Sequence, residues 1–523
     1  MRKLTPALTG LVSAGGALAV AELVAAWLNP TSSPVLAVGA AVVDLTPQWA
    51  KELAIQLFGT NDKLFLLTVI YLSLAAYAVL VGILAQLRPW AGPVGVALFG
   101  AVGVAAALGR PTAGPADVLP TVAGTLAGIW LILFLGKRAR ALADSADEFA
   151  EYVHEQGKRA PTPGREPGRR ALARDQRRSF LVLGGFAVGA LALGGGARLW
   201  AVARSVGTRS REAVKLPVST MPTPEGADLR LPGLSSFHTE NRDFYRIDTA
   251  LSVPQVDAGA WQLKIHGMVD RPVTISFDEL RARPTLERDI TLNCVSNEVG
   301  GPYIGTARWL GVSLGALLRE AGVKPGADQV VSRSTDGWTC GTPVATLLDG
   351  RDAMLAYGMN GEPLPVEHGF PVRMIVPGLY GYVSACKWLA ELEVTTFAEF
   401  DAYWVRRGWS ALGPVKTASR IDTPGGRAKA GPVSVAGVAW AQHRGISKVE
   451  VQVDDGPWQE ARLAAEPTVD TWRQWVHVWD ATPGSHRLRV RATDGTGALQ
   501  TSERVGVVPD GATGWHEVTV AVS

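Results

Sequence analysis

Cysteine and histidine are scarce in this chain, and its acidic and basic side chains are nearly balanced. It has three cysteines among 523 residues, and its eight histidines all lie at His154 or later. A haem held between two histidines is therefore excluded from the apolar N-terminal segments. The formal net charge of +3 gives no sign of a nucleic-acid partner. No second ligand lies near Cys294 at zinc-finger spacing, which disfavours zinc there.

Long apolar runs are present, and they are concentrated at the front of the chain. Residues 1–136 are predicted to form a four-helix transmembrane region, because each run approaches the about 20 residues that cross a bilayer. Charges within the runs are few, which favours an anchor, or a docking site for a partner, over an ion path. The shorter run Pro34–Leu45 suits an interfacial piece. The four long runs are Ala7–Leu28, Leu64–Leu87, Trp90–Leu108 and Val118–Gly136.

The distribution of lysine and arginine predicts the orientation of these helices. Residues 137–178 contain eleven Lys and Arg and are predicted to be a basic cytoplasmic linker. Residues 179–200 are apolar and follow the run DQRRSFL, so they are either a fifth transmembrane helix or a twin-arginine-like signal anchor. Everything after Trp200 is then extracytoplasmic, in a multi-pass protein of the cell membrane. Arg110, on the outer side, departs from this pattern.

The remaining chain divides into three parts. Residues 201–236 are rich in Pro, Ser, Thr and Arg and are predicted to be a linker. Residues 237–408 mix strand-like runs with a helix-like run that Ser313 caps and Gly322 closes, which is typical of an α+β domain. Residues 409–523 hold short alternating runs between turns and predict a β-sandwich. Three nearly alternating tryptophans there, Trp472, Trp475 and Trp479, favour the sandwich core or a dimer face over a ligand surface.

Cys294 lies at the end of a strand-like run, in TLNCVSN. Taken alone, an isolated cysteine is most often a small buried hydrophobe. Cys340 and Cys386 could pair as a disulfide and leave Cys294 free. Further along, MNGEPLPVEHGFPVR and SACKWL bring His, Arg and Lys together around tight turns, and such donors suit a phosphate-bearing ligand. The second stretch also fits the Ser-x-x-Lys of penicillin-binding enzymes, but its companion Lys-Thr-Gly is absent.

Five motifs, taken in chain order, resemble those of the sulfite oxidase family of molybdopterin-dependent oxidoreductases. They are TLNCVSN, GTARWLG, NGEPLPVEHGFPVR, VPGLYGY and KWL. The similarity is to membrane-anchored bacterial members with a C-terminal immunoglobulin-like dimerisation domain. It implies a multi-domain protein with N-terminal transmembrane helices. These helices would be followed by an α+β sulfite-oxidase-type molybdopterin domain over residues 237–408. An immunoglobulin-like β-sandwich would then occupy residues 409–523. The implied cofactor is molybdenum on a single molybdopterin, and the C-terminal domain would form a homodimer.

The resemblance also implies roles for individual residues. Cys294 would supply the protein's thiolate to molybdenum, which suits a soft ligand on this metal. Catalytic roles would fall to Cys294, Arg308, Arg406 and Trp409. Cofactor contacts would fall to Asn241, Tyr245, Arg246, Thr335, His368, Arg373, Ser384, Ala385 and Lys387.

Departures from the family pattern bear on the substrate. Glu298 and Asp248 stand where sulfite-oxidising members carry arginines, and Trp409 stands where they carry a tyrosine. A dianion needs bidentate cationic donors, so two-electron oxygen-atom transfer with an S-oxide or N-oxide is favoured, and sulfite oxidation is the alternative. No haem segment is present, so a separate electron-transfer protein is expected. The alternative from another class, a cofactor-free adhesion or scaffold protein, leaves the His368–Arg373 and Lys387 motifs unexplained.

Overall fold

The computed structural model describes residues 4–28, 32–47, 50, 53, 57, 62–110, 113–156, 185, 189, 205–217, 219, 221–222 and 224–523. The fifth apolar segment, residues 179–200, and the DQRRSFL run before it lie outside the described residues, apart from residues 185 and 189. The chain forms two compact units. The first contains Met1–Ser205 and Thr249–Ser252, and the second contains Val206–Asp248 and Val253–Ser523.

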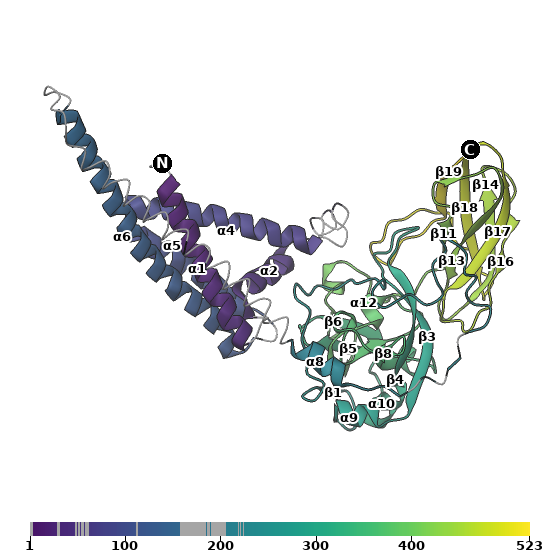
Figure 1. Ribbon diagram of the computed structural model, residues 1–523. Coiled ribbons are helices and arrows are strands. Elements are labelled where there is room, and N and C mark those ends of the chain that lie inside the picture. The colour runs from purple at the N-terminus through teal and green to yellow at the C-terminus, as the bar shows by residue number, and fades with distance from the viewer. Residues whose placement is uncertain are drawn as a thin grey trace. The chain divides into compact units, whose positions relative to one another are not determined.

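The first unit is helical (Figure 1). Its described elements are α1 (Leu4–Leu28), α2 (Pro34–Leu45), α4 (Asp62–Leu87), α5 (Ala91–Leu108), η3 (Pro115–Val118) and α6 (Leu119–Gln156). Four stretches within them are long and apolar enough to cross a membrane: Pro6–Leu28, Leu64–Leu87, Ala91–Leu108 and Pro115–Arg138. The four predicted spans are thus confirmed as helices. This composition and length indicate an association with the membrane.

The basic segment predicted as a linker, residues 137–178, begins as a helix instead. α6 continues without a break to Gln156. The physical reason is that residues 137–156 contain neither Gly nor Pro and are rich in Ala, Glu and Arg, which all favour the helix. The first part of the segment is therefore helical, and residues 157–178 lie outside the described part of the chain.

Small residues let the helices of this unit approach one another closely. A Cβ atom on Gly10 of α1 would lie 1.9 Å from the carbonyl oxygen of Ala78 in α4. A Cβ atom on Gly82 of α4 would lie 2.3 Å from the carbonyl oxygen of Pro6. Backbone is therefore in contact with backbone where α1 crosses α4. Packing of this kind holds helices together in lipid, where apolar burial gives no driving force.

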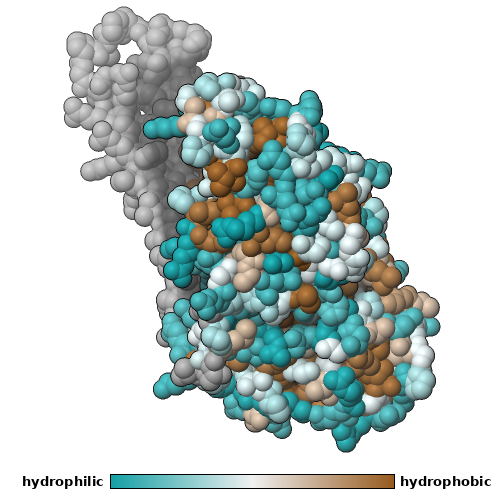
Figure 2. Space-filling view, turned by 90° about the vertical axis from the view of Figure 1, so that its right-hand side faces the viewer, coloured by the Kyte–Doolittle hydropathy of each residue, from teal (hydrophilic) through white to brown (hydrophobic). Residues whose placement is uncertain are grey.

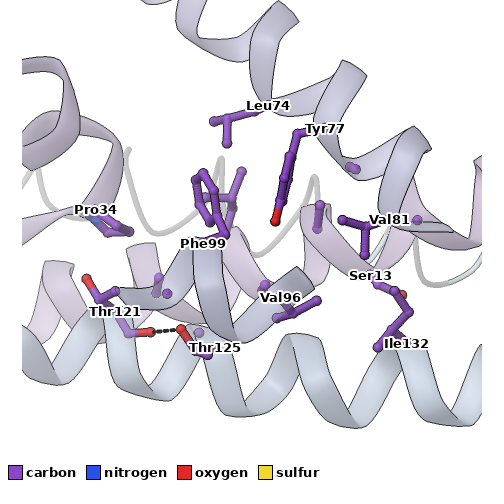
Figure 3. Close-up of a pocket in the computed structure, with 18 residues that line it drawn as sticks. Ser13, Pro34, Leu74, Tyr77, Val81, Val96, Phe99, Thr121, Thr125 and Ile132 are labelled. Carbon is purple, nitrogen blue, oxygen red and sulfur yellow. Dashed lines mark hydrogen bonds between the residues drawn. The ribbon is translucent and has the colours of Figure 1, made fainter. Parts of the chain in front are cut away.

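A small apolar cavity lies among these helices (Figure 3). Its volume is about 70 Å³, and its wall includes Tyr77, Val96, Phe99 and Ile132. The Tyr77 hydroxyl donates to the carbonyl oxygen of Gly95 at 2.8 Å. A cavity of about 150 Å³ is known to admit a benzene ring. The cavity of this bundle therefore has no room for a large cofactor.

The second unit begins with two sheets that carry short helices on their connections, as the expected α+β pattern requires. One sheet has the strand order β2-β1-β10-β5-β6, with β1 and β10 parallel. The other has the order β3-β4-β7-β8, and β9 pairs with β7. The strands are β1 (Gln262–Gly267), β2 (Val273–Ser276), β3 (Thr285–Asn293), β4 (Ile304–Ser313), β5 (Gln329–Ser334), β6 (Thr339–Pro343), β7 (Met354–Met359), β8 (Glu362–Pro363), β9 (Arg373–Ile375) and β10 (Leu389–Thr395).

The short helices of this region follow local sequence signals. Ser313 caps α10 by accepting a hydrogen bond from the backbone of Ala316, and Gly322 closes it with a φ of 74°. The helices are α9 (Phe277–Arg281), α10 (Leu314–Ala321), α11 (Val344–Leu348), η4 (Val366–His368), α12 (Gly381–Ser384) and η5 (Val405–Arg407). Both cap signals of α10 were readable in the sequence.

The segment predicted as a linker, residues 201–236, belongs to the second unit from Val206 onward, which corrects that prediction. It contains α8 (Val206–Ala213), whose Arg211 donates to the carbonyl oxygens of Pro363 and Leu364 at 3.0 Å each. Ala227, further along, is buried in the main core. Composition missed this because α8 is polar, and its stability comes from contacts with residues more than 100 positions away.

The C-terminal part is a sandwich of two sheets around one core. The sheets have the orders β11-β13-β17-β16 and β12-β19-β18-β14-β15. The strands are β11 (Ala418–Thr423), β12 (Arg427–Ala428), β13 (Gly431–Trp440), β14 (Ile446–Val453), β15 (Gln459–Glu460), β16 (Arg462–Leu463), β17 (Arg473–Ala481), β18 (Gly484–Asp494) and β19 (His516–Val522). Trp475 and Trp479 lie in the core between the sheets, as expected. The immunoglobulin-like assignment stays a prediction.

Trp472 has a different position from its two neighbours in sequence. It is buried in the main core of the α+β region, where its indole N–H donates to the carbonyl oxygen of Phe237 at 3.0 Å. Its backbone N–H donates to Thr291 Oγ1 of β3 at 2.7 Å. The sandwich is therefore joined to the strand that leads to Cys294.

On the face shown in Figure 2, hydrophobic residues form patches among hydrophilic ones. Exposed apolar side chains of the sandwich, such as Val478 and Leu499, are of the kind that folded proteins commonly leave at their surface. Dimerisation through this domain stays a prediction.

Candidate active site

Cys294 lies at the start of the loop of residues 294–303, called the cysteine loop below, which joins the antiparallel strands β3 and β4. Its backbone N–H donates to the carbonyl oxygen of Tyr303 at 3.0 Å, so the two ends of the loop are bonded to each other. The side chain is partly exposed. Burial raises the pKa of the Cys294 thiol, and hydrogen bonds from Ser296 act in the opposite direction.

Tyr245 lies next to the strand end that carries Cys294, and Tyr380 directly precedes Gly381, which also adjoins it. A Cβ atom on Gly381 would lie 3.7 Å from the carbonyl oxygen of Asn293 and 3.9 Å from the Tyr245 hydroxyl, so Gly381 and Tyr245 adjoin the strand end that carries Cys294. Burial and the nearby Cys294 raise the pKa of Tyr245. Burial raises the pKa of Tyr380 to about 12, to which Asp510 and Cys294 also contribute. Both phenols are neutral at neutral pH, as tyrosines ordinarily are, and burial raises their pKa values further.

Next to these tyrosines is a buried cluster of basic side chains around one carboxylate. Lys387 Nζ lies 2.5 Å from Asp248 Oδ2, and Arg246 Nε donates to the same oxygen at 2.8 Å. Arg373 is buried, with its guanidinium over the Trp309 ring at 5.1 Å. Burial, with a contribution from nearby Arg373 and Arg246, lowers the pKa of Lys387 to about 8. Burial lowers the pKa of Arg373 to about 10.

His368 is the neutral member of this cluster. Burial, assisted by the charge of Arg373, lowers its pKa to about 4. Its Nε2 donates to the backbone oxygen of Asn241 at 3.0 Å, and the Arg373 guanidinium donates to the backbone oxygen of His368 at 3.1 Å. Arg246 and Lys387 thus share the carboxylate of Asp248, whereas the Arg373 guanidinium bonds to the backbone of His368.

The other predicted cofactor residues surround this cluster. Asn241 is held by Asn360, whose amide donates to Asn241 Oδ1 at 2.9 Å. Ser384 is buried and donates to the carbonyl oxygens of Leu379 and Tyr380. Ala385 ends α12 and donates its N–H to Gly381. Thr335 donates its N–H to Trp388, next to Lys387, at 2.9 Å.

The predicted catalytic arginines are not brought to Cys294 in this way. Arg308 forms a two-pronged ion pair with Asp289 at 2.9 and 3.0 Å. Its remaining donors go to the carbonyl oxygens of Met221 and Pro222. Arg406 is exposed, and its guanidinium lies 5.7 Å from the centre of the Phe400 ring. These two side chains are therefore engaged with the protein itself.

Trp409, the remaining predicted catalytic residue, is buried within an aromatic cluster. Its ring centre lies 6.0 Å from that of Tyr382 and 6.2 Å from that of Trp404. Its indole N–H has no hydrogen-bond partner among the described residues. A packing role accounts for the ring, and its catalytic role stays a prediction.

The suggested disulfide between Cys340 and Cys386 is not formed. All three cysteines are free thiols, and these two are completely buried. Burial and the neighbouring Cys340 raise the pKa of Cys386 well above its usual value. The two thiols remain in contact as neutral groups.

Sequence reasoning missed several residues of this site. Tyr380 is part of the motif VPGLYGY, but the motif does not show that Tyr380 and Cys294 interact electrostatically. Asp248 was read only as a lost arginine, whereas it is the counter-ion of Lys387, 139 positions away. The one available signal was an acidic residue two positions after the predicted contact Arg246.

The donor set fits an anionic cofactor that bears a phosphate. Three buried polar atoms here have no hydrogen-bond partner among the described residues: Asn293 Oδ1, Thr335 Oγ1 and Arg373 Nε. An unsatisfied guanidinium nitrogen in a buried site with excess positive charge is costly unless an anion joins it. Groups of three or more metal-ligating side chains are absent from the described residues, so Cys294 would act as a single protein ligand.

Comparisons with known proteins agree with this chemistry. Residues 250–404 match the family described as oxidoreductase molybdopterin binding domain. The chain is 36% identical over 157 residues to the uncharacterized oxidoreductase YuiH of Bacillus subtilis (strain 168), which covers 30% of this chain and 76% of that protein. It is 31% identical over 274 residues to the mitochondrial sulfite oxidase of Mus musculus, which covers 43% and 50%. The chain thus spans about half the length of that relative.

Among solved structures, the sulfane dehydrogenase SoxCD from Paracoccus pantotrophus is similar at 22% identity and a TM-score of 0.47, covering 56% of this chain and 83% of that chain. The fold, the site and the sequence relatives define a molybdopterin-binding oxidoreductase. The chain belongs to the sulfite oxidase family of these enzymes. The predicted family and cofactor class are therefore confirmed, and the alternative of a cofactor-free scaffold is set aside.

Proposed function

We propose that this protein is a membrane-anchored molybdenum oxidoreductase that removes the oxygen atom from a neutral S-oxide or N-oxide, with two electrons from a separate protein and two protons that convert the oxygen to water. The observation that carries the proposal is Tyr245, which adjoins the strand end that carries Cys294 and interacts electrostatically with both Cys294 and the buried Arg373. The thiol is available to a metal, and the cluster is available to the phosphate of the cofactor. The catalytic region is extracytoplasmic in this proposal.

Each residue has a distinct part in it. Cys294 holds the metal as a thiolate, and Arg373 and Lys387 bind the phosphate, with Asp248 and Arg246 fixing the direction of Lys387. His368 donates from Nε2 to the backbone oxygen of Asn241, so its Nδ1 carries no proton and can accept a hydrogen bond. When bound, molybdopterin supplies the two-electron redox chemistry, and the protein supplies ligation, orientation and electrostatics.

A neutral donor near Cys294 favours a neutral substrate. Tyr245, whose hydroxyl adjoins the strand end that carries Cys294, is neutral at neutral pH, as tyrosines ordinarily are. A phenol can donate one hydrogen bond to an S=O or N–O oxygen, whereas a dianion is best held by a free bidentate guanidinium. The guanidinium of Arg308 is committed to Asp289 and two carbonyl oxygens. Sulfite oxidation remains the second candidate, since relatives named sulfite oxidase match the chain.

The membrane topology of the proposal rests on the count of basic residues. Arg110 is a single arginine on the predicted outer connection, where its guanidinium bonds to Asp117 at 3.1 Å. Residues 137–178 contain eleven Lys and Arg, and the larger count sets the orientation. A separate protein exchanges electrons with the site.

The test uses the full-length protein in detergent, made in a host that synthesises molybdopterin, beside Cys294→Ser and Lys387→Met. We expect near-stoichiometric molybdenum in the wild type, bound pterin without activity in Cys294→Ser, and at least about tenfold less pterin in Lys387→Met, which loses a charge-assisted bond. Lys416→Met is the matched control, because Lys416 pairs with Asp510 at 2.7 Å. A folded wild type without molybdenum would refute the proposal, and sulfite turnover faster than sulfoxide turnover would refute its substrate class.

A further inference from the structure

We propose that Arg420 and His516 of the sandwich are positioning residues for Cys294, which they reach through the Gly300–Gly301 turn of the cysteine loop. This inference rests on the proposed role of Cys294 as the metal ligand. According to this proposal, the C-terminal sandwich fixes the direction in which the thiolate of Cys294 points. The sandwich therefore contributes to the geometry of the active site.

The cysteine loop is an internally bonded unit, which is the first step. The backbone oxygen of Cys294 accepts a hydrogen bond from the N–H of Asn297 at 3.1 Å. Asn297 Oδ1 accepts one from the N–H of Tyr303 at 2.8 Å. Gly301 is pressed against Asn297, since a Cβ atom on Gly301 would lie 2.6 Å from Asn297 Oδ1. A displacement of the turn therefore moves Asn297, and with it the backbone of Cys294.

Arg420 of β11 holds one side of the turn. Its Nη1 donates to the carbonyl oxygen of Gly301 at 2.8 Å, and its Nη2 donates to Ser235 Oγ at 3.0 Å. Its Nε donates to Asp422 Oδ1 at 2.6 Å. The Arg420 side chain is 11% exposed. A guanidinium fixed by partners on all three nitrogens is a rigid donor, so the bond to Gly301 sets the position of the turn.

His516, the first residue of β19, holds the other side. Its Nδ1 accepts a hydrogen bond from the N–H of Ile421 at 2.9 Å, which places the ring proton on Nε2. A Cβ atom on Gly300 would lie 2.3 Å from His516 Nε2, so only glycine fits against the ring at this residue. Gly300 also has a φ of 80°, which glycine adopts readily. Burial and nearby Arg420 lower the pKa of His516 to about 4, which keeps the ring neutral.

The two contacts come from different sheets of the sandwich and meet on one turn. β11 and β19 belong to the four-stranded and five-stranded sheets, respectively. The turn is therefore held between the sheets' ends, and the strand β3 that precedes Cys294 is joined to the sandwich separately through Thr291 and Trp472. Arg420 and His516 do not touch the reacting groups, so they act through the loop.

The first experiment uses cofactor-free full-length protein from a host that cannot make molybdopterin. The rate of Cys294 alkylation by iodoacetamide is measured by peptide mass spectrometry in the wild type, Arg420→Ala and His516→Ala. We expect about a tenfold faster reaction in both variants, because Arg420→Ala loses the hydrogen bond to Gly301 and His516→Ala loses the ring packed against Gly300. His516→Asn, which restores an acceptor near Nδ1, should return the rate most of the way. Equal rates in all four proteins would overturn the inference.

The second experiment uses the loaded enzyme and the electron paramagnetic resonance spectrum of Mo(V). Arg420→Ala should change the g values, because they report the direction of the Cys294 thiolate, while the molybdenum content stays that of the wild type. Arg491→Ala is the matched control, since Arg491 pairs with Glu450 at 2.9 Å and lies over Trp458 within the same sandwich. If Arg491→Ala alters alkylation and spectrum as much as Arg420→Ala does, general loosening explains both and the inference fails. A wild type without molybdenum would refute the proposed function instead, and the alkylation rates would still decide whether Arg420 and His516 position the loop.

Discussion

His368 illustrates how a single side chain carries both the fold and the site. Its motif, HGFPVR, predicted a cofactor contact from the sequence, and the structure places it against Arg373 and the backbone of Asn241. The neutral state of the ring could not be predicted, because it depends on burial by residues from several separate segments. Tyr380 and Asp248 were missed for the same reason, because their interactions in the site are with residues far away in the sequence.

This neutral state makes stability depend on pH. The pKa of His368 falls from 6.5 to about 4 on folding, so the unfolded chain binds a proton more readily than the native protein does. The stabilisation is complete above about pH 6.5 and is lost as the pH falls toward 4, by about 3 kcal/mol. Urea unfolding of cofactor-free protein, followed by tryptophan fluorescence, should show this loss between pH 6.5 and 4. In His368→Gln the slope should be smaller, and an unchanged slope would contradict the assignment.

At the scale of elements, sequence signals succeeded where stability is local. The bounds of α10 follow from Ser313 and Gly322, and the four spans follow from apolar length. The helix α8 and the extension of α6 to Gln156 were missed, because neither has an apolar face that marks it. The close approach of α1 and α4 was also beyond the sequence, since glycine alone does not show which backbone it touches.

Gly82 gives a direct test of that helix contact. An added methyl group would meet the carbonyl oxygen of Pro6, so Gly82→Ala should destabilise the helical unit by about 1–3 kcal/mol through overpacking. Gly114→Ala is the matched control, because a Cβ atom there meets nothing within 4 Å. Thermal unfolding in detergent, monitored by far-ultraviolet circular dichroism, measures the difference. Equal melting temperatures for the two variants would show that α1 and α4 do not meet at Gly82.

At the scale of the whole molecule, the second unit starts earlier than composition indicated. α8 is tied to the α+β region by Arg211, which pairs with Glu362 and donates to two backbone oxygens. The sequence placed a linker here because Pro, Ser and Thr are frequent. A buried core residue at Ala227 and a bonded helix show that this stretch is part of the folded unit.

The boundary can be tested with two fragments. The fragment 206–523 should be more stable than 220–523 by about 2 kcal/mol, since the shorter one loses the charged hydrogen bonds of Arg211. Urea midpoints of the two fragments measure this. Arg211→Ala in the longer fragment should account for most of the difference. Equal midpoints would mean that α8 contributes nothing to the fold.

The hydrogen bond from Arg420 to the carbonyl oxygen of Gly301 also affects how such proteins can diverge in sequence. A sandwich that was joined to the rest of the chain only by a peptide linker could be exchanged between relatives as an independent domain. Here an exchanged sandwich would need an arginine at the place of Arg420 and a ring at the place of His516 that fit the Gly300–Gly301 turn. Recombination within the family should therefore succeed only when both partners of this contact are inherited together.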